Sequence, residues 1–167
     1  MSDKRDEKLG IAFSNNFSSD EVAEITDAFG KIVPVSRMRY GQDSIDATTV
    51  LVTVAIVTFI FFPLSKIADG FFESIGSDLY QKAKEKVVSA MKNKKNPNIQ
   101  FVLWHKNVRI VINAVAKNEA ELNSIFDTIA KARKIAINEI EKDSQIHEIT
   151  IGYDVNVNGY WNVTFKA

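Results

Sequence analysis

The uncharged run Ala47–Ser65 constrains this chain more than any other sequence feature. It contains no Asp, Glu, Lys, Arg, Asn, Gln or Gly, and it lies between Asp46 and Lys66. At about 1.5 Å per residue, a helix of this length spans roughly 28 Å, close to the hydrocarbon thickness of a bilayer, about 30 Å. The run therefore predicts one very apolar helix, which either enters a membrane or is buried between other elements of a water-soluble fold.

Length and composition limit the protein class. With 167 residues the chain can bury a sizeable core, and we expect a single domain over residues 1–167. Basic and acidic residues number 21 each, so bulk charge gives no argument for nucleic-acid binding. The absence of cysteine excludes disulfides, thiolate nucleophiles and cysteine-based metal sites. The charged N-terminus is unlike a secretory signal, which predicts a cytoplasmic protein; the membrane alternative adds peripheral or integral membrane association.

Residues 9–40 have the pattern of a β-α-β unit. Ser18 with Glu21 forms a capping-box signature, which predicts that a helix begins there. Apolar residues at helical spacing follow, and Gly30 gives the stop. Pro34 lies in the second strand, which predicts an edge position because proline cannot donate a ladder hydrogen bond.

Residues 44–92 are expected to form a helical hairpin inserted between two sheet-forming parts. Its first arm is the apolar run, and its second arm is a long amphipathic helix over roughly 64–92. Apolar residues recur in the second arm at four-residue steps, at Ile67, Phe71, Ile75, Leu79, Ala83 and Val87. Gly70 and Gly76 are expected to bend or break this helix, since each costs about 1 kcal/mol relative to alanine.

Residues 98–167 read as β-β-α-β-β. Two strands, 99–104 and 108–115, are joined by a tight turn around His105–Asn107, and a helix is expected to begin at Asn118. For the last two strands we expect a three-residue loop, 157–159, with a bulge at Gly159. That loop pairs Tyr153 with Val163 and puts both apolar sets on one face. The fold class is therefore α+β, with the β-α-β and β-β-α-β-β parts sharing one sheet.

The stretch after the apolar run carries a short motif. Gly70-Phe71-Phe72 followed by Gly76-Ser77-Asp78-Leu79-Tyr80 resembles a pattern in small bacterial proteins of unassigned function, in which an apolar helix precedes Gly-Phe and Gly-x-Asp-x-Tyr. The resemblance implies a bacterial cytosolic origin and no catalytic or binding residue.

Two sets of residues are candidates for contact with a partner or a membrane. The candidate hydrophobic interaction or membrane face comprises Val50, Val54, Val57, Phe61, Phe62, Phe71 and Phe72. The candidate anionic-surface contact comprises Lys82, Lys86, Lys92, Lys94 and Lys95. The second set follows from the basic excess just after the apolar run, which anionic lipid attracts.

No pattern in the chain indicates catalysis. His105 and His147 are the only histidines, lie far apart in the sequence and have no local carboxylates converging on them. The glycines are scattered singly, so no phosphate-binding loop exists. We therefore expect no catalytic residues, no metal, no cofactor and no small-molecule ligand, and the lack of a nucleic-acid motif argues against that partner.

The sequence thus predicts a non-enzymatic interaction module. In this interpretation the hydrophobic hairpin packs in the fold, against a protein partner or against a second copy. The alternative is a membrane-inserting or membrane-anchored protein in which residues 47–65 form a lipid-embedded helix.

Overall fold

The computed structural model describes residues 7–39, 55–63, 66–154 and 160–166. The strands in these ranges are β1 (Leu9–Phe13), β2 (Val35–Arg39), β3 (Ile56–Ile60), β4 (Asn98–His105), β5 (Val108–Val115), β6 (Glu148–Asp154) and β7 (Tyr160–Lys166). Together they form one seven-stranded sheet in the order β2-β1-β3-β4-β5-β6-β7. Parallel and antiparallel pairs alternate across this order, so the sheet is mixed.

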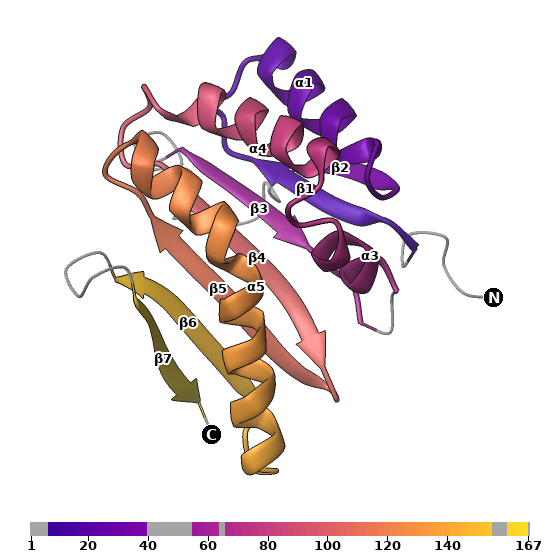
Figure 1. Ribbon diagram of the computed structural model, residues 1–167, viewed down its shortest axis with the longest axis vertical. Helices are drawn as coiled ribbons and strands as arrows, with labels where there is room; N and C mark the ends of the chain where they lie inside the picture. Colours follow the sequence, from indigo (N-terminus) through magenta and orange to yellow (C-terminus); the bar gives the residue numbers. More distant parts are fainter. Residues whose placement is uncertain (1–6, 40–54, 64–65, 155–159, 167) are drawn as a thin grey trace.

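All helices of the described chain lie on one face of this sheet (Figure 1). They are α1 (Ser19–Gly30), α3 (Ile67–Glu73), α4 (Asp78–Met91) and α5 (Glu119–Lys142). Helices α1 and α4 pack side by side near the β1–β2 edge, and α5 runs across the β4–β6 region. The predicted α+β fold, with its β-α-β and β-β-α-β-β parts in one sheet, is confirmed.

The β-α-β unit forms as its local signals indicate. The Ser18 hydroxyl oxygen accepts from the backbone N–H of Glu21 at 3.1 Å, and the Glu21 carboxylate accepts from the Ser18 backbone N–H at 2.8 Å. This capping box satisfies two backbone donors that the first turn of α1 would otherwise leave without partners. Strand β2 pairs in parallel with β1 and is an edge strand, which confirms the interpretation of Pro34.

The sequence predicts a helix over the apolar run, residues 47–65, and this prediction is wrong for the residues of the run that the structure describes. Residues 56–60 form strand β3, which pairs antiparallel with β1 and parallel with β4. Val57 and Phe59 are buried on the helix side, and Thr58 is buried on the opposite side. A strand inside the sheet with both faces buried has no alternation of polar and apolar residues, so its sequence resembles that of a buried helix.

The second arm of the expected hairpin is helical but consists of two helices. Helix α3 ends at Glu73 and α4 begins at Asp78, with Ser77 as its N-cap. The break coincides with Gly76, whose φ of 91° is open to glycine at little cost. Because residues 56–60 form β3, the described part of residues 44–92 does not form the predicted helical hairpin.

The β4–β5 hairpin and α5 agree with the sequence prediction. His105 pairs with Val108, so the turn consists of Lys106 and Asn107, which have φ values of 47° and 64°. Two successive positive φ values match the right-handed twist of the strands they connect. Helix α5 begins after Asn118, whose side chain accepts from the Glu121 backbone N–H at 2.9 Å.

The predicted register of the last two strands is wrong by two residues. Tyr153 pairs with Trp161 instead of Val163, and Ile151 pairs with Val163. The parity of the prediction holds, because odd-numbered residues still pair with odd-numbered residues. The predicted loop and the bulge at Gly159 lie outside the described residues.

Candidate interaction surface

The residues predicted as a hydrophobic contact face are placed mainly in the core. Val57, Phe61, Phe71 and Phe72 are buried, and Phe62 is half-buried. They therefore pack within the fold and are not available to a partner in this structure. Val50 and Val54, the remaining members of that set, lie outside the described residues.

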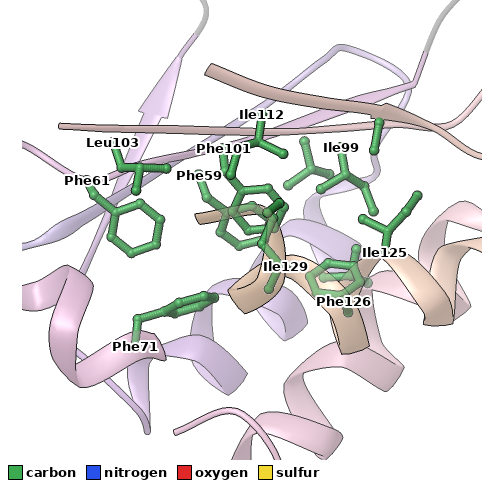
Figure 2. Packing of buried hydrophobic residues seen from close by; sticks show 14 of the residues in the cluster. Phe59, Phe61, Phe71, Ile99, Phe101, Leu103, Ile112, Ile125, Phe126 and Ile129 are labelled. Carbon is green, nitrogen blue, oxygen red and sulfur yellow. The ribbon is translucent and has the colours of Figure 1, made fainter. Parts of the chain in front are cut away.

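Phe71 joins the two halves of the chain in an aromatic cluster. Its ring centroid lies 6.0 Å from that of Phe29 on α1, 5.1 Å from that of Phe61 after β3 and 6.5 Å from that of Phe101 on β4. Phe59 stacks on Phe101 with centroids 4.9 Å apart. Figure 2 shows the rings of Phe59, Phe61, Phe71 and Phe101 between the sheet and the helices. Edge-to-face and offset pairs of this kind add about 0.5–1.5 kcal/mol each beyond burial.

The predicted cationic surface divides into exposed lysines and structural ones. Lys82, Lys92 and Lys95 are exposed. Lys86 on α4 pairs with Glu24 on α1 at 3.2 Å. Lys94 is part-buried: it pairs with Glu21 at 3.1 Å, donates to the Asn16 carbonyl and lies 4.8 Å from the centre of the Phe17 ring. Lys86 and Lys94 thus tie the α4 region to α1.

The face of the sheet opposite the helices carries a different surface. Along β4 and β5, residues that alternate with the buried ones point away from the helices. We call six of them the open-face patch: Gln100, Val102, Trp104, Val111, Asn113 and Val115. No helix of the described residues covers this face (Figure 1).

Large apolar side chains are exposed on the open-face patch. Trp104 is 38% exposed and Val115 is 46% exposed, while the directly paired Val102 and Val111 are half-buried. The side chains on the water-exposed face of a sheet are normally polar. Apolar side chains on both faces of β4 and β5 are instead typical of strands that are covered on both sides. Toward β1 the same side of the sheet is already covered, since Ala12 and Thr58 are buried.

A row of polar side chains crosses the middle of this face. The Thr58 hydroxyl donates to Gln100 Oε1 at 3.2 Å, and Gln100 Nε2 donates to Asn113 Oδ1 at 3.4 Å. The row lies between the Val102–Val111 pair and Val115. Directly opposite Trp104, the face carries Arg109, which pairs with Glu148 on β6 at 3.2 Å. The open-face patch itself is uncharged.

The titratable groups packed under α5 have structural contacts. Lys84 on α4 is buried and pairs with Asp127 on α5 at 3.0 Å. The Tyr80 hydroxyl donates to the Phe126 carbonyl at 2.7 Å, and burial, with a smaller contribution from the charge of Asp127, raises the pKa of Tyr80. These contacts hold α4 against α5.

The two histidines have different surroundings in the structure. His105 Nε2 lies 2.7 Å from Glu141 Oε1, and Lys106 pairs with the other oxygen of Glu141 at 2.7 Å. Hydrogen bonds from His105 first and then from Lys106 lower the pKa of Glu141. The β4–β5 turn is thereby attached to the end of α5, and His147 is exposed.

A shallow groove of about 220 Å³ lies between α3 and α5, lined by Phe72, Ala130, Arg133, Lys134 and Ile137. Ligand pockets usually occupy about 300–1,000 Å³, so this groove is small. The Arg133 guanidinium lies 4.6 Å from the centre of the Phe72 ring and donates to Asp69 at 2.9 Å. Its charge is therefore already used to join α3 to α5.

The open-face patch is the surface that sequence reasoning missed. A signal for it existed: the outward positions of both strands carry Val102, Trp104, Val111 and Val115 where Lys, Glu or Thr are typical.

In the described ranges, no group of three or more His, Asp or Glu side chains could hold a metal ion. None of the helices in those ranges has both the length and the apolar character needed to cross a bilayer. Comparison of the chain with family models, curated proteins and solved structures gives no match.

Proposed function

We propose that this protein is a non-enzymatic interaction module that binds a protein partner through the open-face patch. The observation that carries the proposal is the exposure of Trp104 and Val115 on a sheet face over which no described helix lies. Exposed apolar groups on a continuous surface mark interaction sites more often than chance, whereas single exposed apolar residues need no explanation.

The composition of the patch supports a protein partner. Protein interfaces are depleted of charge at their centre and enriched in aromatic residues, and this patch is uncharged and contains a tryptophan. Its rim carries the Arg109–Glu148 pair, as the polar rim of an interface does. These features support protein binding at the open-face patch, and we propose it in preference to membrane insertion on that ground.

The non-enzymatic part of the proposal is supported by the way the described titratable groups are used. Lys84 with Asp127 and His105 with Glu141 each join two elements of the fold. The first pair holds α5 against α4, and the second holds the end of α5 against the end of β4.

Site-specific photo-cross-linking in the native host tests the proposed surface. A benzoylphenylalanine residue replaces Trp104 in one variant and Leu79 in the other. Leu79 is a matched control because it is also a large apolar residue, 44% exposed, on the outer side of α4. We expect an adduct of higher mass from position 104 and none from position 79. Equal yields at both positions, or no adduct at position 104, would overturn the proposal.

A further inference from the structure

We infer that β7 pairs antiparallel with β7 of a second copy of this chain, about a two-fold axis perpendicular to the sheet. This contact uses the edge of the sheet and not the open-face patch, so it does not rest on the proposed function. Strand β7 is the last in the strand order, and no other described strand pairs with its outer side (Figure 1). The outer side of an edge strand presents backbone N–H and C=O groups that another strand can bind.

Strand β7 lacks the features with which proteins usually protect a sheet edge. It is seven residues long, contains no proline and has its one charged residue, Lys166, at its end. Most of its other residues are aromatic or β-branched, which favours pairing in a sheet. Protected edges are instead short, or carry proline or charges within the strand. The composition of β7 is therefore that of a strand with a neighbour on each side.

The opposite edge of the same sheet has these protective features. Strand β2 is five residues long, follows Pro34 and carries Arg37 and Arg39. Antiparallel pairing of β2 with its own copy over its whole length would put Arg37 opposite Arg37. Like charges directly opposite each other destabilise a strand pair. The two edges thus differ, and the difference favours β7 as the contact between copies.

The sequence of β7 is complementary to itself when the two-fold axis passes through Val163. All seven residues then have a partner, and the opposed pairs are Tyr160–Lys166, Trp161–Phe165, Asn162–Thr164 and Val163–Val163. Two of these pairs join aromatic residues, two join polar residues, and none puts like charges opposite each other. Aromatic and polar cross-strand pairs of this kind stabilise a sheet.

The same axis makes one continuous sheet from the two copies. It pairs odd-numbered positions with odd-numbered ones, as the β6–β7 register does, so the helix-covered faces of both copies lie on the same side. Two-fold pairing is also closed, because it uses β7 of both copies. The edges that remain are the two β2 strands, which the arginines protect.

Sedimentation velocity on the purified full chain, from about 1 to about 200 μM, tests for the second copy. We expect the mass to rise with concentration from that of one chain, 18.7 kDa, toward twice that value. A chain that stays monomeric over the whole range overturns the inference.

Disulfide cross-linking tests the register. The chain contains no cysteine, so Asn162→Cys and Thr164→Cys each carry a single thiol. In the inferred dimer, position 162 faces position 164 of the other copy, with Cα atoms about 5 Å apart, whereas two identical positions are more than about 7 Å apart. A disulfide needs the shorter separation, so the equimolar mixture should cross-link at least about tenfold faster with copper phenanthroline than either variant alone.

Arg37→Cys is the matched control, because it puts a thiol at the centre of the other edge strand. We expect it to cross-link no faster than the single β7 variants. Cross-linking of Arg37→Cys as fast as the mixture overturns the inference, and so do equal rates for the mixture and its two components.

A second pair of variants keeps the register test decisive if one of the first pair fails to fold. Tyr160→Cys and Lys166→Cys lie at the two ends of β7 and face each other in the same register. Far-UV circular dichroism checks the fold of every variant. The result is independent of photo-cross-linking at position 104, so loss of the β7 contact leaves the proposed function in place, and the reverse also holds.

Discussion

Tyr80 shows how one residue couples burial to a polar contact. Its ring is buried against Phe71, with centroids 5.8 Å apart, while its hydroxyl donates to the Phe126 carbonyl on α5. Burial, then the negative charge of Asp127, raises the pKa of Tyr80 above its ordinary value of about 10. Ionisation of this group is therefore more favourable in the unfolded chain than in the folded one.

Replacing Tyr80 with Phe should change both stability and its pH dependence. At pH 7 the loss of the hydrogen bond should lower the free energy of unfolding by about 1 kcal/mol. A group with a raised folded pKa contributes stability below its unfolded pKa, and this contribution is lost as pH rises. Urea titrations above about pH 10 should therefore show wild type losing stability more steeply than Tyr80→Phe. The control is Tyr153→Phe, which removes a tyrosine hydroxyl but leaves that of Tyr80 in place. If Tyr80→Phe lost stability with rising pH as steeply as wild type, the raised pKa of Tyr80 would not be the cause.

At the scale of elements, the ends of helices follow from a few residues. Ser18 and Glu21 begin α1, Ser77 begins α4, and Gly76 allows the chain to turn between α3 and α4. The break at Gly76 lets α3 place Phe71 against the sheet while α4 packs along α1. One backbone conformation that favours glycine thus sets the relative directions of two helices.

Two glycine-to-alanine variants should have opposite effects. Gly76→Ala forces a Cβ into a φ of 91° and should cost about 1–2 kcal/mol, although open space surrounds the position. Gly30→Ala, at the end of α1 and also in open space, should stabilise by about 0.5 kcal/mol, because alanine favours the helix. Urea denaturation measures both, and a destabilisation of the same size in each variant would show that φ is not the cause.

At the scale of the whole molecule, the aromatic cluster makes the two ends of the chain one cooperative structure. Phe29 and Phe59 come from the N-terminal part and Phe101 comes from the C-terminal part, and their rings meet around Phe71. Phe126, also from the C-terminal part, packs against Phe59 and Phe101. Strand β3 makes the same connection in the sheet, because it pairs with β1 on one side and β4 on the other. Loss of packing in the cluster is therefore expected to reach both parts.

Replacing Phe71 with Ala should destabilise the C-terminal part as well as its own segment. We expect a loss of about 3–5 kcal/mol, a large part of the about 5–15 kcal/mol typical of a domain. Both tryptophans lie in the C-terminal part, so their fluorescence and far-UV circular dichroism should give one shifted urea midpoint. Phe62→Ala, at a half-buried position, should cost less. A fluorescence transition that stays in place while the dichroism transition shifts would refute this coupling.

Local sequence signals determined the elements whose structure depends on near neighbours. The capping box at Ser18, the stripe of α5, the turn at Lys106–Asn107 and the edge position after Pro34 each depend on contacts within a few residues or on a property of one residue. The physical cause acts over the same short range as the pattern. These elements were predictable for that reason.

Only the tertiary structure decided the nature of residues 56–60 and the location of the candidate surface. A strand takes its hydrogen bonds from distant segments, here residues 10–13 and 98–102, and a uniformly apolar segment carries no period that distinguishes strand from helix. The β-branched residues of the run favour a strand, but the prediction followed only its length and lack of charge. Once β3 completed the sheet, Val57 and Phe61 became core, and the outward residues of β4 and β5 formed the exposed apolar face. Which apolar residues are buried is decided by the partners that cover them, and those partners are set by the fold as a whole.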